Sequence, residues 1–241
     1  MLSFLVVLQA CSPSDPLEEI RQEQARGQLE PSIEKLRVLL AERQGDAELL
    51  YLYGQTLSLS GRAGLAEWAL REAMRDPEWL VPAGMQLATD LARSRNFEMA
   101  IEIATAVLEA EPDSIDALLI RASANAHSRM FYEEALADVA RVLELEPDNI
   151  DVMEPQILSL LALDRIDEVA TAMDELGRKI DENDSEGGAP AWHCATTAIF
   201  ADESGDLELA KTRWANCLES HPSNNEVVLK SLPFYDKLGQ F

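Results

Sequence analysis

The feature that most constrains this chain is a segment that repeats itself after 35 residues. Residues 96–148 hold two similar helical stretches, and each ends in the triplet Glu-Pro-Asp, at residues 111–113 and 146–148. Ala100 and Ala135, which hold matching places in the two stretches, are also 35 residues apart. Repeated helical units bury their apolar faces by stacking on their neighbours. The repeat therefore predicts an all-α solenoid.

This pattern resembles the tetratricopeptide repeat, a helix–turn–helix unit of about 34 residues. That family has small residues where the two helices cross, a glycine in the turn between them and a proline after the second helix. The resemblance covers residues 13–241 and implies about six repeats in a right-handed superhelix, followed by a terminal helix. The expected repeats are 13–46, 47–80, 81–114, 116–149, 150–183 and 191–224.

The chain divides along these repeats. Residues 17–183 are expected to hold repeats one to five, and 184–190 form a turn-rich insertion. Residues 191–241 are expected to hold the sixth repeat and the terminal helix. Gly239 and Phe241 match the turn glycine and the aromatic residue that follows it in the family pattern. We therefore expect a truncated seventh repeat, with this sequence being the front part of a longer chain.

An apolar leader opens the sequence and stops at a cysteine. Leu8-Gln9-Ala10-Cys11 resembles the lipobox of bacterial lipoproteins. The resemblance implies that residues 1–10 are a signal peptide, that Cys11 is lipidated and that residues 11–16 form a tether. Ser12 stands where an aspartate signals inner-membrane retention, so a periplasm-facing outer-membrane lipoprotein is implied. The alternative is an uncleaved leader on a cytoplasmic protein.

Acidic residues far outnumber basic ones. The 44 Asp and Glu against 20 Lys and Arg give a net charge of −24. This charge disfavours binding to nucleic-acid phosphates and anionic membrane surfaces. Because the acidic residues are spread along the helices, they predict a solvated surface, with an acidic groove for a basic partner as the alternative.

Two cysteines fall in one expected repeat. Cys194 lies near the start of its first helix and Cys217 near the end of its second. These two ends of an antiparallel hairpin lie side by side, so a disulfide is predicted if the protein is exported. In a cytosolic protein the same residues would be two reduced, buried thiols.

The sequence contains no catalytic signature. His127, His193 and His221 lie far apart, and CxxC, HExxH, P-loop and GxSxG motifs are all missing. We therefore expect no enzyme activity, no cofactor, no metal site and no small-molecule substrate.

The partner-binding surface is inferred from the resemblance. In tetratricopeptide superhelices, recurring positions of the first helix of each repeat line a concave groove. Most of the matching residues here are apolar, with a few polar ones, which favours an extended or helical peptide with apolar anchors. These residues are Tyr51, Gln55, Met85, Thr89, Ile120, Ala124, His127, Glu154, Leu158, Trp192 and Ile199.

Together these features predict a non-catalytic scaffold of the bacterial cell envelope that binds a protein or peptide partner. It resembles the tetratricopeptide lipoproteins that assist envelope assembly, among them pilotins. Two alternatives stay open from the sequence. One is the docking or regulatory front of a longer enzyme, and the other is a soluble cytosolic adaptor.

Overall fold

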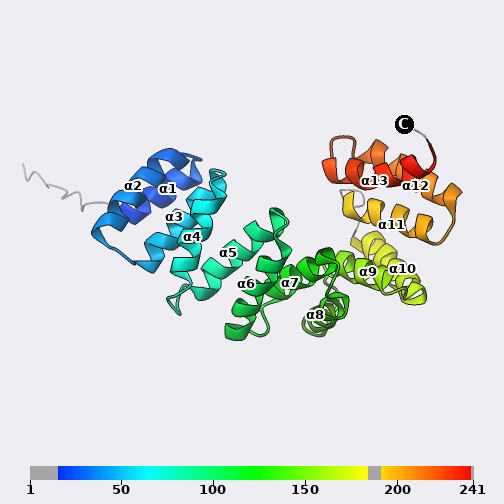
Figure 1. Cartoon of the computed structure of the whole chain (residues 1–241), viewed down its shortest axis with the longest axis horizontal. Coiled ribbons are helices and arrows are strands. Elements are labelled where there is room, and N and C mark those ends of the chain that lie inside the picture. The colour runs from blue at the N-terminus through cyan, green and yellow to red at the C-terminus, as the bar shows by residue number, and fades with distance from the viewer. Residues whose placement is uncertain (1–15, 184–190, 240–241) are drawn as a thin grey trace, which may run out of the picture. The chain divides into compact units, whose positions relative to one another are not determined.

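The computed structural model describes residues 16–183 and 191–239, and helices are its only regular secondary structure there (Figure 1). The chain divides into two units between Ser94 and Arg95. Unit 1 contains α1 (Pro16–Ala25), α2 (Leu29–Glu42), α3 (Ala47–Leu59), α4 (Ala63–Ala73) and α5 (Leu80–Arg93). Unit 2 contains α6 (Phe97–Ala110), α7 (Ile115–Ser128), α8 (Tyr132–Leu145), α9 (Met153–Ala162), α10 (Ile166–Asn183), α11 (Ala191–Glu203), α12 (Leu207–Ser220) and α13 (Asn225–Lys237).

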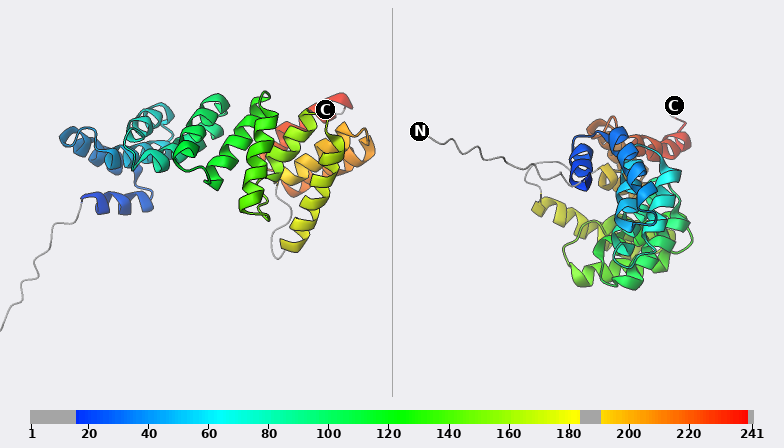
Figure 2. Two further views of the ribbon diagram at one scale, coloured as in Figure 1. Left: turned by 90° about the horizontal axis from the view of Figure 1, so that it is seen from below. Right: turned by 90° about the vertical axis from the view of Figure 1, so that its left-hand side faces the viewer.

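Within each unit, most helices that follow one another in sequence pack side by side (Figures 1 and 2). First helices of neighbouring repeats also touch, as α3 touches α5 and α7 touches α9. This is the packing that the 35-residue repeat predicts, because each unit buries its apolar face on the next. The all-α prediction is confirmed for the described residues.

Helix α1 begins one residue earlier than the sequence suggested. The tether was expected to include Pro16, but α1 starts at this residue. Proline suits the first turn of a helix because its missing N–H would have no intrahelical acceptor there. Leu17 and Ile20 of α1 are buried against Leu36 of α2 and Leu49 of α3, so the first helix belongs to the core of unit 1.

Left-handed backbone marks the turn between the two helices of each repeat. Gly27, Gly61 and Gly205 have φ between 72° and 81° at this position, and Gly239, which follows α13, has φ of 64°. Arg95, Arg129 and Asp164 hold the same position with φ of 59° to 62°, although they carry a Cβ. The turn geometry is therefore kept where the glycine is missing. These three residues carry a steric cost, because a Cβ in the left-handed conformation crowds the backbone.

The sixth repeat is closed covalently. A disulfide joins Cys194 of α11 to Cys217 of α12, with 5.5 Å between their Cα atoms, as the sequence predicts. Cys217 lies in a core with Ala198, Ala210 and Trp214. The bridge therefore ties the open ends of the α11–α12 hairpin together.

Several predicted segments lie outside the described residues. They are the signal peptide 1–10, Cys11, the tether up to residue 15, the insertion 184–190 and the last two residues. Within 16–183 and 191–239, none of the helices has both the length and the apolar character needed to cross a membrane.

Candidate functional site

In unit 1, the predicted binding residues lie on α3 and α5, and all four are half-buried. Tyr51 packs its ring against Trp79, with the ring centroids 5.1 Å apart. Gln55 Nε2 lies 3.5 Å from the hydroxyl of Tyr51. Met85 and Thr89 follow one another by one helical turn on α5, where the Thr89 hydroxyl donates to the Met85 carbonyl. Unit 1 thus offers an aromatic and amide surface on its first helices.

In unit 2, the predicted residues lie on α7, α9 and α11. Six are half-buried and thus partly accessible, namely Ile120, His127, Glu154, Leu158, Trp192 and Ile199. We call these six the first-helix surface of unit 2. Ala124 was also expected to line the groove, but it is only 1% exposed. A methyl side chain this deep belongs to the helix packing, so Ala124 offers no surface to a partner.

His127 and Glu154 are brought together from neighbouring helices. His127 Nε2 lies 3.9 Å from Glu154 Oε1. His127 Nδ1 lies 2.8 Å from the Ser123 carbonyl, which can only accept, so Nδ1 carries a proton. The imidazole also packs on Phe97, with the ring centroids 5.4 Å apart. The histidine is thereby held in one orientation, with Nε2 turned toward α9.

Lys230 of α13 joins this polar group, and the sequence analysis missed it. Its Nζ lies 3.3 Å from Glu154 Oε1 and 2.8 Å from Glu226 Oε1. Burial lowers the pKa of Lys230, but its hydrogen bonds and attraction to Glu226 and Glu154 outweigh burial and raise that pKa. The hydrogen bond from Lys230 lowers the pKa of Glu226. The i, i+4 spacing of Glu226 and Lys230 was the one signal in the sequence, and it gives no hint of Glu154.

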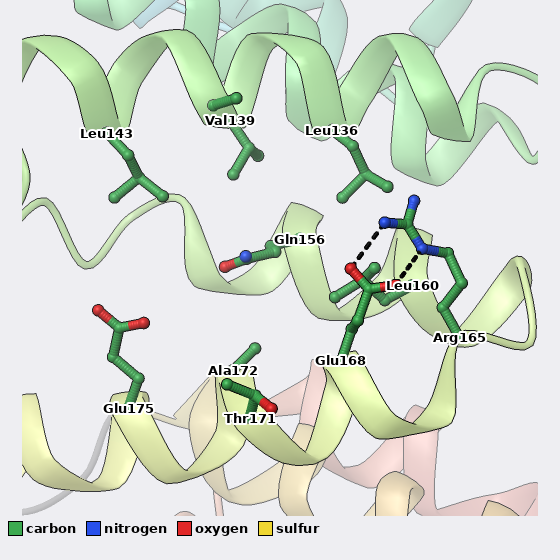
Figure 3. Close-up of a pocket in the computed structure, with 11 residues that line it drawn as sticks. Leu136, Val139, Leu143, Gln156, Leu160, Arg165, Glu168, Thr171, Ala172 and Glu175 are labelled. Carbon is green, nitrogen blue, oxygen red and sulfur yellow. Dashed lines mark hydrogen bonds and ion pairs between the residues drawn. The ribbon is translucent and has the colours of Figure 1, made fainter.

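A cavity of about 330 Å³ opens between α8, α9 and α10 (Figure 3). Leu136, Val139 and Leu143 of α8 form its apolar wall. At one end Arg165 donates from Nε and Nη2 to the two carboxylate oxygens of Glu168, both at 2.6 Å. That hydrogen-bonded pair lowers the pKa of Glu168. The cavity is thus an apolar trough with an ion pair at its rim.

A second cavity, of about 400 Å³, opens between α6, α7 and α8. Its α7 residues, Arg121 and Asn125, lie one position beyond Ile120 and Ala124, and therefore about 100° further round the helix. Arg121 donates to Asp138 from Nε and Nη2, at 2.8 Å and 2.6 Å. This pairing raises the pKa of Arg121 despite its partial burial. The second cavity is thus polar at its base, unlike the first.

Among residues 16–183 and 191–239, no three His, Cys, Asp or Glu side chains gather as a metal site requires. His193 is half-buried, and burial, followed by the nearby positive charge of Arg213, lowers its pKa. What the arrangement provides is partly buried apolar surface with a few fixed polar groups, which suits binding.

Comparison with known proteins matches structures but not sequences. No protein-family model matches the chain, and no curated protein sequence matches it either. A tetratricopeptide repeat protein from Parabacteroides merdae ATCC 43184 aligns with a TM-score of 0.63 at 15% identity, over 91% of this chain and 96% of its own.

Two further solved structures are similar to the same degree. PilW, described as a widely conserved type IV pilus biogenesis factor, aligns with a TM-score of 0.66 at 11% identity, over 89% of this chain and 96% of its own. PilF of Pseudomonas aeruginosa aligns with a TM-score of 0.62 at 14% identity, over 92% and 96%. At such identities the likeness concerns the fold alone. The chain has the all-α fold of the tetratricopeptide repeat proteins.

Proposed function

We propose that this protein is a non-catalytic scaffold that binds a segment of a partner protein on the first helices of its repeats. The partner segment is extended or helical and inserts apolar side chains between the first helices. We further propose that the scaffold is held in the bacterial cell envelope by a lipid on Cys11, on the periplasmic side of the outer membrane.

The observation that carries the binding proposal is the first-helix surface of unit 2. Ile120, Leu158 and Ile199 stand on three helices in a row, and each keeps part of its apolar side chain accessible. His127 and Glu154, whose Nε2 and Oε1 atoms lie 3.9 Å apart, add two polar side chains on α7 and α9. Apolar anchors surrounded by a few oriented polar groups are the usual composition of a peptide-binding surface.

Two observations support the envelope. The Cys194–Cys217 disulfide fits an oxidising compartment such as the periplasm. PilW, whose fold this chain shares, is described as a type IV pilus biogenesis factor. The lipobox-like Leu8-Gln9-Ala10-Cys11 supplies the candidate anchor.

The binding proposal is tested by photo-crosslinking in the native cell. A photoreactive amino acid replaces Leu158 on the first-helix surface, and in a matched variant it replaces Glu144, an exposed residue on α8. We expect a discrete adduct from position 158, none from 144, and loss of the 158 adduct when Ile120→Asp is added. The melting temperature of the Ile120→Asp variant shows whether that loss reflects binding or unfolding.

Equal adducts at positions 158 and 144, or a 158 adduct that survives Ile120→Asp, would refute binding on the first helices.

The anchor is tested separately by the intact mass of the protein from its native cell. A chain that begins at Cys11 and carries acyl groups supports the lipoprotein, whereas an unmodified chain starting at Met1 contradicts it. A Cys11→Ala variant serves as the unlipidated control.

A further inference from the structure

The cavity between α6, α7 and α8 contains a buried polar side chain that nothing engages. Asn125 lines this cavity and is only 3% exposed. Its backbone carbonyl accepts from the Ser128 hydroxyl, but in the part of the chain that the structure describes no hydrogen bond uses its side-chain amide. Among the described residues, the fully enclosed side-chain atoms that lack a hydrogen-bond partner belong to Ser159, His193 and Trp214, so the Asn125 amide opens into the cavity, where a ligand can reach it.

The floor of the cavity holds further unused donors. Arg121 donates hydrogen bonds from three of its five N–H groups, two to Asp138 and one to the Thr105 hydroxyl at 3.3 Å. Two N–H groups of the guanidinium are left over. Asp138, only 5% exposed, fixes the guanidinium from one side, so these donors are held in place.

The rest of the lining is apolar or carries negative charge. Ile101, Ala137 and the ring of Phe131, which is 39% exposed, supply apolar surface, and Glu134 is exposed beside them. One positive and two negative side chains thus line the cavity. A carboxylate ligand would be repelled by this excess of negative charge, and an ammonium group would be repelled by the Arg121 guanidinium at the floor.

We infer that this cavity is a binding site for a neutral amide flanked by an apolar side chain, as in the main chain of a peptide segment. In such an extended segment, the carbonyl of one residue accepts from Asn125 Nδ2 and Arg121, and the N–H of the same residue donates to Asn125 Oδ1. The adjoining apolar side chain lies on Ile101 and Phe131. The site is separate from the first-helix surface, because Arg121 and Asn125 lie about 100° round α7 from Ile120 and Ala124.

The next repeat supplies an internal comparison. Its equivalent cavity, in Figure 3, has Leu160 at 35 residues from Asn125 and Gln156 at 35 residues from Arg121. Thr105 has Ala140 as its counterpart at 35 residues, and Asp138 has Ala172 at 34 residues. The Arg121–Asp138 ion pair and the Asn125 amide are therefore particular to the α6–α8 cavity, and stacking one repeat on another does not require them.

The test uses three small probes: N-acetyl-leucinamide is neutral and carries two amides, N-acetyl-leucine has a carboxylate in place of the second amide, and leucinamide has an ammonium group in place of the first. Each is titrated into the full chain labelled with ¹⁵N, and the side-chain amide signals of Asn125 and the Nε–H signal of Arg121 are followed by NMR. We expect the neutral N-acetyl-leucinamide to shift these signals with a Kd of about 1–10 mM, as its small size allows. The carboxylate and the ammonium probes should bind roughly tenfold more weakly.

Two variants complete the design. Asn125→Leu copies the residue of the next repeat, so it should fold and should weaken N-acetyl-leucinamide binding about tenfold or more, read on the Arg121 signal. Gln156→Leu, the matched change in the other cavity, should leave the titration unaltered. The inference is overturned if all three probes bind alike, if shifts occur only on the first-helix surface, or if Asn125→Leu binds as the parent does. Should Asn125→Leu fail to fold, the charge series on the parent chain decides.

Discussion

Gly54 of α3 has no room for a side chain, because α4 passes directly over it. A Cβ built at this residue would lie 2.6 Å from Leu70 Cγ and 2.8 Å from its Cδ2. Leu70 is fully buried and has nowhere to move. We expect Gly54→Ala to lower the free energy of unfolding by about 1–3 kcal/mol, as overpacking does.

Gly64, near the start of α4, is the matched control for this substitution. A Cβ there would meet nothing within 4 Å. Gly64→Ala should therefore stabilise by about 0.5–1 kcal/mol, since alanine restricts the unfolded chain and favours helix. Urea denaturation measures both variants, and equal stability of the two would refute the tight α3–α4 crossing.

His193 makes the stability of the protein depend on acidity. Burial, and secondly Arg213, lowers its pKa from the ordinary 6.5, so the folded protein prefers the neutral imidazole. The unfolded chain then takes up a proton at a higher pH than the folded one. The stability linked to His193 is present above pH 6.5 and is lost as pH falls below it toward the folded pKa.

We expect His193→Leu to flatten the fall in unfolding free energy between about pH 7 and pH 5. Parent and variant share every carboxylate, so the difference between their pH profiles isolates the imidazole. Chemical denaturation at several pH values is the measurement. Parallel profiles would show that His193 titrates alike in the folded and unfolded chains.

At the scale of the element, the turn between α7 and α8 carries avoidable strain. Arg129 sits there with φ of 62°, where glycines stand in the turns at Gly61 and Gly205. A left-handed residue with a Cβ is disfavoured by about 1–2 kcal/mol. We expect Arg129→Gly to stabilise by about 1 kcal/mol, reduced by the added freedom of the unfolded chain, and Gly61→Ala to destabilise by a similar amount. Thermal unfolding compares the two, and a loss of stability in Arg129→Gly would contradict this account.

The α11–α12 hairpin depends on its bridge. Cys194 and Cys217 are 23 residues apart in sequence, and closing such a loop stabilises by about 3 kcal/mol in the chain-entropy model. The double variant Cys194→Ala/Cys217→Ala should melt at a lower temperature than the parent. Dithiothreitol should bring the parent down to the level of the variant and leave the variant unchanged. A parent insensitive to reductant would argue that the bridge contributes nothing to stability.

At the scale of the whole molecule, charge opposes compactness. With a net charge of −24, the acidic side chains repel one another. Many ion pairs, such as Arg37–Glu34, are exposed and therefore contribute little to stability. Salt screens this repulsion over a Debye length of about 10 Å at 0.1 M. We therefore expect the melting temperature to rise between low and moderate NaCl concentrations, as differential scanning calorimetry would measure. A fall would mean that attractive pairs outweigh the self-repulsion.

The sequence by itself determined the repeat, its turns, its small crossing residues and the pairing of Cys194 with Cys217. These features depend on contacts within one repeat or between neighbours, so a 35-residue period contains them. The sequence also assigned the proposed partner-binding residues to the first helices of their repeats, because their positions follow the register of the repeats. The contacts of these residues could not be predicted from the register.

Only the tertiary structure decided which side chains meet across repeats. Lys230 reaches Glu154 over 76 residues, and no local pattern encodes that distance. The burial of Ala124 and the unused amide of Asn125 depend on how closely particular helices approach each other. The physical reason is that periodicity fixes the face of a helix on which a residue lies, whereas packing in three dimensions fixes what that residue touches.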